Sequence, residues 1–257
     1  MKLLFGSTIK PEGWKSVDRS GGDYRIHVSK ESDFSIFSDS SVDRIYSSHM
    51  IEHMPIEDVQ FWFDQSYRML KPGGILRVCA PDAIMFLREY KDDPNSFGKS
   101  SKEYGVGSGR NYYQEIEMWT NMLSLDPDHK AECLSPHNLL ASEFCTYCDH
   151  PQYGHTFDKD TSEKLLGKIK EPVSDNDPNV DIYLDWVCSH YDTRRPAGHQ
   201  TAFYSAKVAK MLKGSGFNSN NIHTMKFRDS HCEDIRTNPK IDLDRRRTIS
   251  FYTEVIK

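Results

Sequence analysis

Two stretches decide the fold of this chain: residues 41–54 (SVDRIYSSHMIEHM) and residues 70–82 (LKPGGILRVCAPD). In the first stretch, residues 41–47 predict a short strand and residues 48–55 predict a polar turn. A helix is expected to begin near Glu57, because large apolar residues then recur three or four positions apart.

This expected helix has one apolar face, and the residues that recur along it are Val59, Trp62, Phe63, Tyr67 and Leu70. The sequence KPGG at residues 71–74 predicts its end, because Pro lacks the backbone donor and Gly tolerates left-handed backbone. Residues 75–80 (ILRVCA) then predict a buried strand, and residues 83–90 predict another helix. The region therefore alternates strand, helix, strand and helix, which is typical of an α/β fold.

The N-terminal segment predicts two more strands, at residues 2–5 and at residues 15–18, the second of which ends in Asp18. Parallel strands are normally joined by a crossover that contains a helix. The connection at residues 6–14 is too short for one, so we expect a turn around Pro11 and Gly13 to replace the first helix.

The charge balance argues against a nucleic-acid partner. The chain has 257 residues, 33 basic and 38 acidic side chains and a net charge of -5, so it lacks a broad positive field. The apolar run at residues 3–5 is too short for a signal peptide or a membrane span. Six cysteines at irregular spacing suggest reduced thiols. We therefore expect a cytoplasmic protein that binds neither nucleic acid nor membrane, and its oligomeric state is not indicated.

The two deciding stretches together resemble the fourth and fifth strands of the S-adenosylmethionine-dependent methyltransferases of the small type 11 group. Residues 5–18 look like the compressed first motif of one subgroup of that family. Residues 198–199, 205–217 and 250–257 are similar to the ending of the same subgroup. The resemblance covers residues 1–90 and 198–257.

The resemblance implies a class I methyltransferase fold. This fold is a Rossmann-like, three-layer α/β sandwich whose sheet is mostly parallel, with an antiparallel last strand. It also implies S-adenosylmethionine as cofactor and methyl transfer to a small-molecule or carbohydrate acceptor. The expected chain is a single domain over residues 1–257 with an insertion at approximately 93–198.

The insertion is expected to be helical or irregular and to act as a lid and acceptor pocket. Its composition is rich in Asp, Asn, Pro, Gly and Ser, and helical spacing occurs near residues 115–125, 139–147 and 161–170. The glycines at residues 105–109 resemble part of a dinucleotide fingerprint, but no apolar strand precedes them, so we interpret them as a loop. The absence of GxGxxG after the first strand also disfavours a nicotinamide-dependent oxidoreductase.

In an open parallel sheet, ligands bind at the carboxyl ends of the strands, where the strand order reverses next to the first strand. Gly6 would let the methionine part of the cofactor approach the backbone, and Asp18 could accept both ribose hydroxyls; the resemblance implies the same roles. The alternative is a turn glycine and a capping carboxylate. The expected cofactor-binding residues are Phe5, Gly6, Ser7, Asp18, Ser47, Ser48 and His49.

Two histidines are candidate catalytic bases. His49 follows the strand at residues 41–47, and His199 precedes the helix at residues 202–213. Imidazole titrates near neutral pH, so either ring could take the proton of an acceptor. Glu52 and His53 are expected to hold the turn by hydrogen bonds, and a capping or core role is the alternative for His199.

Two other interpretations stay open. Thr8 stands where the family commonly has a second glycine, which favours a non-catalytic binding or scaffold protein that has lost the cofactor. A metal site would need Cys145 and Cys148 together with Cys133, His129, His137, His150 or His155. Only one CxxC is present and its flanks have helical spacing, so we expect ordinary thiols and no metal.

Overall fold

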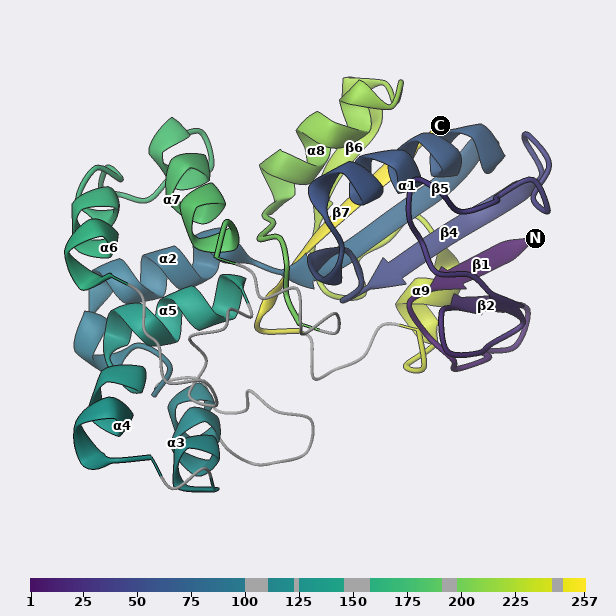
Figure 1. The fold of residues 1–257 in the computed structure, drawn as a ribbon. Coiled ribbons are helices and arrows are strands. Elements are labelled where there is room, and N and C mark those ends of the chain that lie inside the picture. Colours follow the sequence, from purple (N-terminus) through teal and green to yellow (C-terminus); the bar gives the residue numbers. More distant parts are fainter. Residues whose placement is uncertain (100–110, 123–124, 146–157, 191–197, 242–246) are drawn as a thin grey trace. The chain divides into compact units, whose positions relative to one another are not determined.

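The computed structural model describes residues 1–99, 111–122, 125–145, 158–190, 198–241 and 247–257 (Figure 1). The chain divides into two compact units. The first unit consists of Met1–Asp82 and Phe203–Lys257, and the second of Ala83–Ala202. No helix within these described ranges is both long and apolar enough to cross a membrane.

The first unit is built on a seven-stranded sheet, counted over the described residues, with the order β3-β2-β1-β4-β5-β7-β6. Neighbouring strands from β3 to β5 run parallel, and β7 is antiparallel to both β5 and β6. The predicted mostly parallel sheet with an antiparallel last strand is confirmed. The strands are β1 (Lys2–Phe5), β2 (Lys15–Asp18), β3 (Tyr24–Arg25), β4 (Val42–Ser48), β5 (Leu70–Pro81), β6 (Ile222–Met225) and β7 (Ser250–Ile256).

Residues 6–14, all of which are described, contain no helix, as expected from the length of this connection. The backbone turns instead, with Trp14 N–H donating to the Pro11 carbonyl at 3.0 Å. Gly13 has a φ of 76°, which side chains rarely tolerate. The turn leaves β1 and β2 directly paired and parallel without a crossover helix.

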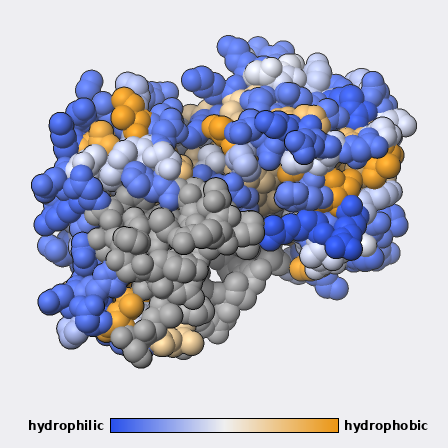
Figure 2. All heavy atoms as spheres, in the orientation of Figure 1, coloured by the Kyte–Doolittle hydropathy of each residue, from blue (hydrophilic) through white to orange (hydrophobic). Residues whose placement is uncertain are grey.

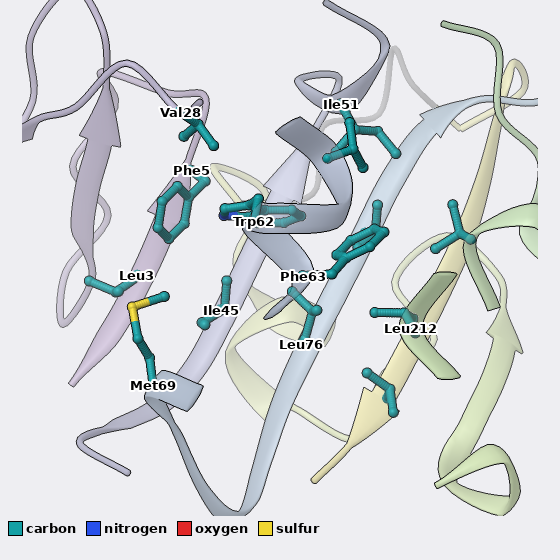
Figure 3. Close-up of a cluster of buried hydrophobic side chains, with 14 of the residues drawn as sticks. Leu3, Phe5, Val28, Ile45, Ile51, Trp62, Phe63, Met69, Leu76 and Leu212 are labelled. Atoms are coloured by element: carbon teal, nitrogen blue, oxygen red, sulfur yellow. The ribbon is translucent and has the colours of Figure 1, made fainter. Parts of the chain in front are cut away.

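Helix α1 (Ile56–Met69) covers one face of the sheet. Trp62 and Phe63 point onto this face in Figure 3, and the Trp62 ring meets Phe5 edge-on at a centroid distance of 5.5 Å. Helix α8 (Ser205–Gly214) lies beside α1. Gln60 of α1 donates a hydrogen bond at 2.7 Å to Ser215 Oγ, directly after the end of α8. The apolar periodicity therefore identified the helix and most of its buried face correctly.

The end of α1 differs from the prediction. The helix ends at Met69, and β5 begins at Leu70 rather than at residue 75. Leu70 has extended backbone, and Gly73 has a φ of 76°, so the KPGG sequence follows the end of the helix as an irregular first part of β5. The predicted helical residue Tyr67 is half-buried and packs edge-on against Phe217 at 5.0 Å.

The opposite face of the sheet is covered by a small cluster that includes Leu4, Trp14, Tyr46 and Ile235. Ile235 lies on helix α9 (Glu233–Thr237), which the sequence did not predict. Asp234 of this helix accepts from Trp14 Nε1 at 3.1 Å and pairs with Lys2. Residues near the end of the chain thus cover the strand that begins it.

The second unit is helical over its described residues. Its helices are α2 (Ala83–Asp92), α3 (Tyr112–Met122), α4 (Pro127–Cys133), α5 (Pro136–Phe144), α6 (Lys159–Leu166) and α7 (Pro178–Cys188). The expected helical segments near residues 115–125, 139–147 and 161–170 correspond to α3, α5 and α6. Short 3-10 helices η1 (Ile51–His53), η2 (Pro94–Ser96) and η3 (Ser219–Asn221) complete the two units.

Helices α4 and α7 were not predicted because their start signals looked like loop sequence. Each begins with an Asp-Pro pair, and the Asp caps the helix: Asp126 accepts from His129 N at 3.0 Å, and Asp177 accepts from Asn179 N at 3.0 Å. Fully buried Tyr183 on α7 contacts Phe144 edge-on at 6.3 Å, so this aromatic ring belongs to the core of the second unit.

Apolar side chains on the surface are scattered. In Figure 2 they form small patches separated by hydrophilic side chains on the visible face. The large apolar residues that remain most exposed are Met1, Ile9, Ile36, Ile56, Met122 and Ile182. Single exposed apolar residues are normal for a folded protein.

Candidate functional site

The carboxyl ends of β1, β2 and β4 lie at one edge of the first unit. Strand β1 pairs with β2 on one side and with β4 on the other, and Phe5 is in register with both Val17 and Ser47. The strand order therefore reverses around β1, which is where open α/β sheets bind ligands. The structure places all seven predicted cofactor-binding residues at or directly after these strand ends.

Phe5 and Gly6 shape this edge from within. The Phe5 side chain is fully buried against Trp62 and Phe34, so it supports the edge and does not line it. Gly6 has a φ of 71°, and a Cβ at this position would lie 2.7 Å from Met50 Cβ. The turn after β1 thus requires glycine for conformational and steric reasons of its own.

Ser7 and Asp18 form short local turns. Ser7 Oγ accepts from Ile9 N at 3.1 Å, and Asp18 Oδ1 accepts from Ser20 N at 2.8 Å and from the Ser20 hydroxyl. The half-buried Asp18 carboxylate is therefore held at the end of β2, and both of these bonds use Oδ1. The capping role that the sequence left open is present in the structure.

Ser47 and Ser48 end β4 with buried hydroxyl groups. Their Oγ atoms are inaccessible and make no hydrogen bond within the described part of the chain. Trp62 Nε1 and Ser66 Oγ on α1 are buried without a partner in the same sense. A buried polar group without a partner costs about 1–3 kcal/mol, so each such group calls for an explanation, such as a ligand or a water molecule.

His49 follows Ser48 with a left-handed backbone, at a φ of 53°. Its N–H donates to the Cys79 carbonyl of β5 at 2.8 Å, and its side chain is only 5% exposed. Nε2 lies 2.7 Å from Ser250 Oγ, and Nδ1 lies 3.2 Å from Glu52 Oε1. Non-glycine residues with positive φ cluster at functional sites, because the surrounding structure must impose the strain.

Glu52 is a buried carboxylate between two imidazoles. Its side chain is 3% exposed, and Oε1 lies 3.2 Å from His49 Nδ1 and 3.8 Å from His53 Nε2. Burying a carboxylate is costly unless it has a partner. Glu52 sits in the 3-10 turn η1, and its contacts with the two rings are ion-pair contacts rather than the hydrogen bonds that were expected to hold the turn.

Ser250 is a site residue that sequence reasoning did not select. It begins β7, is half-buried, and contacts the His49 ring across a sequence separation of 201 residues. Its only signal in the sequence is its position at the start of the family-like ending at residues 250–257. No local pattern could pair it with His49.

His199 belongs to the second unit, whereas His49 belongs to the first. Its Nδ1 lies 2.9 Å from the carbonyl oxygen of Glu143. A carbonyl only accepts, so Nδ1 carries the proton and the neutral ring presents Nε2 as an acceptor. Burial, with a smaller contribution from Glu89, raises the pKa of the Glu143 carboxyl well above its ordinary value.

Some of the metal-ligand candidates can be placed. Burial raises the pKa of the Cys133 thiol to about 11, and its Sγ lies 3.6 Å from His129 Nε2. Cys148, His150 and His155 lie outside the described residues, as do the glycines at residues 105–109.

One of the comparisons with known proteins bears on this geometry. Residues 6–78 match a family model described as a methyltransferase domain. A search of curated proteins finds no match. Together with the sheet order, the match over residues 6–78 supports a Rossmann-like class I methyltransferase fold for the first unit.

One similar solved structure is described as that of a possible exported protein from Bordetella parapertussis. It is 11% identical, with a TM-score of 0.35, and the alignment covers 99% of this chain and 61% of that one. The present chain thus spans about three fifths of the length of that relative.

Proposed function

We propose that this protein transfers a methyl group from S-adenosylmethionine to a hydroxyl of a small-molecule or carbohydrate acceptor. The observation that carries the proposal is the pair of buried, unpartnered hydroxyls of Ser47 and Ser48. They lie beside β1 at the strand ends, within the segment that matches the methyltransferase family. Because neither Oγ atom is accessible in this structure, neighbouring side chains must move before a bound ligand can supply the hydrogen-bond partners that these groups lack.

The residues at this edge fit the methyl donor. The Gly6 turn would receive its amino-acid part, Asp18 Oδ2 would accept from the ribose, and Ser47 and Ser48 would line the reacting end. When bound, S-adenosylmethionine supplies a methyl group on a positively charged sulfur. The protein would align the acceptor oxygen with this methyl group, because proximity provides much of the rate in such displacements.

His49 is the proposed base of the first unit, and His199 is a second candidate in the other unit. A hydroxyl acceptor keeps its proton near neutral pH, so a base within hydrogen-bond reach speeds its reaction. His49 is held on both sides of its ring, by Glu52 and by Ser250. The acceptor class, the catalytic roles and the predicted cytoplasmic location stay predictions.

A second candidate function is non-catalytic binding by a protein that has lost the cofactor. Two observations favour it. Thr8 replaces a glycine that is common in the family, and Gly6 and Asp18 both have structural roles that need no ligand. The two candidates differ in one measurable property, which is the affinity for the methyl donor or its product.

Calorimetric titration with S-adenosylhomocysteine tests the proposal. We expect micromolar binding that Asp18→Ala weakens by about 1–3 kcal/mol, the loss typical of hydrogen bonds to a charged group. Asp93→Ala is the matched control, because Asp93 also accepts from a backbone N–H two residues on and from a Ser hydroxyl, but lies in the second unit. No binding at millimolar ligand would favour the non-catalytic candidate.

If binding is found, the acceptor can be sought by following S-adenosylhomocysteine release. Small alcohols, phenols and sugars form the test set, and amines and carboxylates form the comparison set. Release that requires a hydroxyl compound would support the proposed acceptor class, whereas release only with amines would contradict it.

A further inference from the structure

Three side chains at the carboxyl ends of the central strands form a line. Glu52 comes from the turn η1, His49 follows β4, and Ser250 begins β7. The ring of His49 connects the other two, with Nδ1 3.2 Å from Glu52 and Nε2 2.7 Å from Ser250. Since β5 lies between β4 and β7 in the sheet, the imidazole reaches across one strand to its hydroxyl partner.

The backbone of His49 is shaped for this reach. Its φ of 53° lies in the left-handed region, which few residues other than glycine adopt, although His does so more often than most. The amide is fixed by the hydrogen bond to the Cys79 carbonyl of β5. The fold therefore holds the ring in a single direction instead of leaving it on a mobile turn.

The position of the proton on the ring follows from the chemistry of its two neighbours: Ser250 is in hydrogen-bond contact with Nε2, and Glu52 is in ion-pair contact with Nδ1. An ionised carboxylate only accepts, so a proton between Glu52 and His49 belongs to Nδ1. The neutral ring then has its lone pair on Nε2, and Ser250 donates its hydroxyl proton to it. The oxygen of Ser250 keeps its capacity to accept a hydrogen bond from another molecule.

The exposure of the three residues gives the line an inner and an outer end. The side chains of Glu52 and His49 are 3% and 5% exposed, whereas Ser250 is half-buried. The carboxyl group is thus deep and the hydroxyl is near the surface. This is the order that a proton would follow from an outside molecule to a buried base.

We propose that Ser250, His49 and Glu52 form a proton relay, with Ser250 as the group that contacts a neutral hydroxyl of the acceptor. The inference rests on the proposed methyl transfer and narrows its acceptors to alcohols and sugars that keep their proton at neutral pH. Ser250 and His49 carry the proton. Glu52 is a positioning residue, because it orients the ring and stabilises its protonated form.

The step balances in atoms and charge. The acceptor oxygen forms a bond to the methyl carbon, the carbon-sulfur bond breaks, and its electron pair stays on the sulfur. The acceptor proton passes to Ser250 Oγ while the Ser250 proton passes to His49 Nε2. The ring then carries a positive charge next to Glu52, and it returns the proton to water before the next turnover.

The first test uses the full chain labelled with ¹⁵N-histidine, with the His49 signal assigned from its loss in His49→Gln. NMR of the unmodified protein should show Nδ1 protonated and Nε2 bare in the neutral ring. The groups placed against His49 include Glu52 and, beyond it, His53, so both histidines are followed during the titration. A neutral ring protonated on Nε2 would overturn the relay without any variant.

Glu52→Gln then removes the negative charge and keeps the size of the side chain. The titration midpoint of His49 should fall by about one pH unit or more, because an adjacent carboxylate favours the protonated ring. Glu57→Gln is the matched control, since Glu57 is exposed at the start of α1. Equal shifts in the two variants would contradict the assignment of Glu52.

Side chains that only stabilise the fold would also orient the His49 ring. A kinetic measurement therefore separates a structural role from a role in proton transfer. With a hydroxyl acceptor, the acidic limb of the kcat/KM profile should move with the NMR midpoint in Glu52→Gln. Ser250→Ala should lower kcat at least tenfold, and Ser250→Thr should restore most of it. Unchanged kcat in Ser250→Ala would refute the relay.

The proposed function and the relay can fail separately. Absence of S-adenosylhomocysteine binding in the unmodified protein would sink both, and the three side chains would then only connect β4 to β7. Normal binding in all variants, together with a neutral ring protonated on Nε2, would retain the methyltransferase and remove the relay.

Discussion

The sheet of the first unit contains two buried polar regions with opposite character. Between β5 and β7, Arg77 and Glu254 face each other in register, both fully buried, with Nη1 3.5 Å from the carboxylate. Arg77 also donates to the carbonyls of Asp229 at 2.7 Å and Lys226 at 2.9 Å, and Glu254 accepts from Ser230 and His231. Each Nη and each carboxylate oxygen has a partner, and among the side-chain polar atoms of this pair only Arg77 Nε makes no hydrogen bond within the described residues.

At the carboxyl end of β4, buried polar groups lack the hydrogen bonds that most atoms of the Arg77–Glu254 pair make. The hydroxyls of Ser47 and Ser48 are buried without a hydrogen-bond partner in the described residues, and the next residue, His49, has strained backbone. Polar groups in a structural network satisfy one another, whereas those of a binding site wait for a ligand. The contrast separates the part of the sheet that holds the fold from the part that we expect to bind.

The largest effect is expected in the satisfied region. Arg77→Met should destabilise the protein by about 3–5 kcal/mol, because it leaves Glu254 buried without its cation. Urea unfolding followed by near-UV circular dichroism measures the loss. The double change Arg77→Met with Glu254→Leu should recover much of it, and a double variant as unstable as the single one would show that the pair itself stabilises the fold.

A smaller loss of stability is expected at Gly6, in the turn that follows β1. Gly6→Ala should cost about 2–3 kcal/mol, because it combines positive φ with a clash against Met50. Gly13→Ala is the matched control, since Gly13 has a φ of 76° and nothing within 4 Å of an added Cβ. We expect that variant to lose only about 1 kcal/mol. Equal thermal-unfolding shifts would remove the role assigned to Met50.

Substitution of Ser47, at the carboxyl end of β4, should weaken ligand binding and hardly change the stability of the fold. Ser47→Ala should change the free energy of unfolding by less than about 0.5 kcal/mol, because no hydrogen bond is lost. The same substitution should weaken the binding of S-adenosylhomocysteine by about 0.5–1.5 kcal/mol. Ser66→Ala removes a hydroxyl that is equally buried and unpartnered but lies on α1. Calorimetry should show weaker binding only for Ser47→Ala.

The smallest effect concerns Asp43, at the opposite end of β4 from Ser47. Hydrogen bonds from Lys71 and from the Met1 amino group lower the pKa of Asp43 from 3.8 to about 2. A depressed pKa means that this stabilisation is complete above pH 4 and is lost as the pH falls towards 2. The Asp43 side chain is 40% exposed, so screening limits the effect to less than about 1 kcal/mol.

The measurement for Asp43 is urea unfolding between pH 5 and pH 2. Asp43→Asn should show a shallower loss of stability over this range than the unmodified protein. Parallel curves would indicate that the ion pairs with Lys71 and the amino group contribute nothing in solution.

The elements that the sequence predicted correctly are those specified by local pattern. Strands β1 and β2 and helix α1 follow from apolar runs and from 3.6-residue periodicity. Helix α9 was missed because only Ile235 is buried on it, and α4 and α7 were missed because Asp-Pro looked like a break. Strand β5 begins earlier than expected because pairing of Leu70 with Val42 extends it through two glycines.

The sequence predicted where the candidate site lies but not which of its side chains contact one another. The order of motifs placed Gly6, Asp18 and Ser47 at the strand ends, because parallel strands present their carboxyl ends at one edge. The contact of His49 with Ser250 and the burial of Glu52 depend on the tertiary structure. No local signal encodes a left-handed histidine that reaches across a strand.

The missing helix between β1 and β2 has a consequence for the order of assembly on the ribosome. In this protein Leu4 and Trp14 are covered by Cys232, Ile235 and Ile241, whose segment is synthesised more than two hundred residues later. The face of β1 that carries Leu4 is therefore covered much later than the face that carries Leu3 and Phe5. During synthesis, this side of the nascent sheet stays open to chaperones until residues 232–241 have appeared.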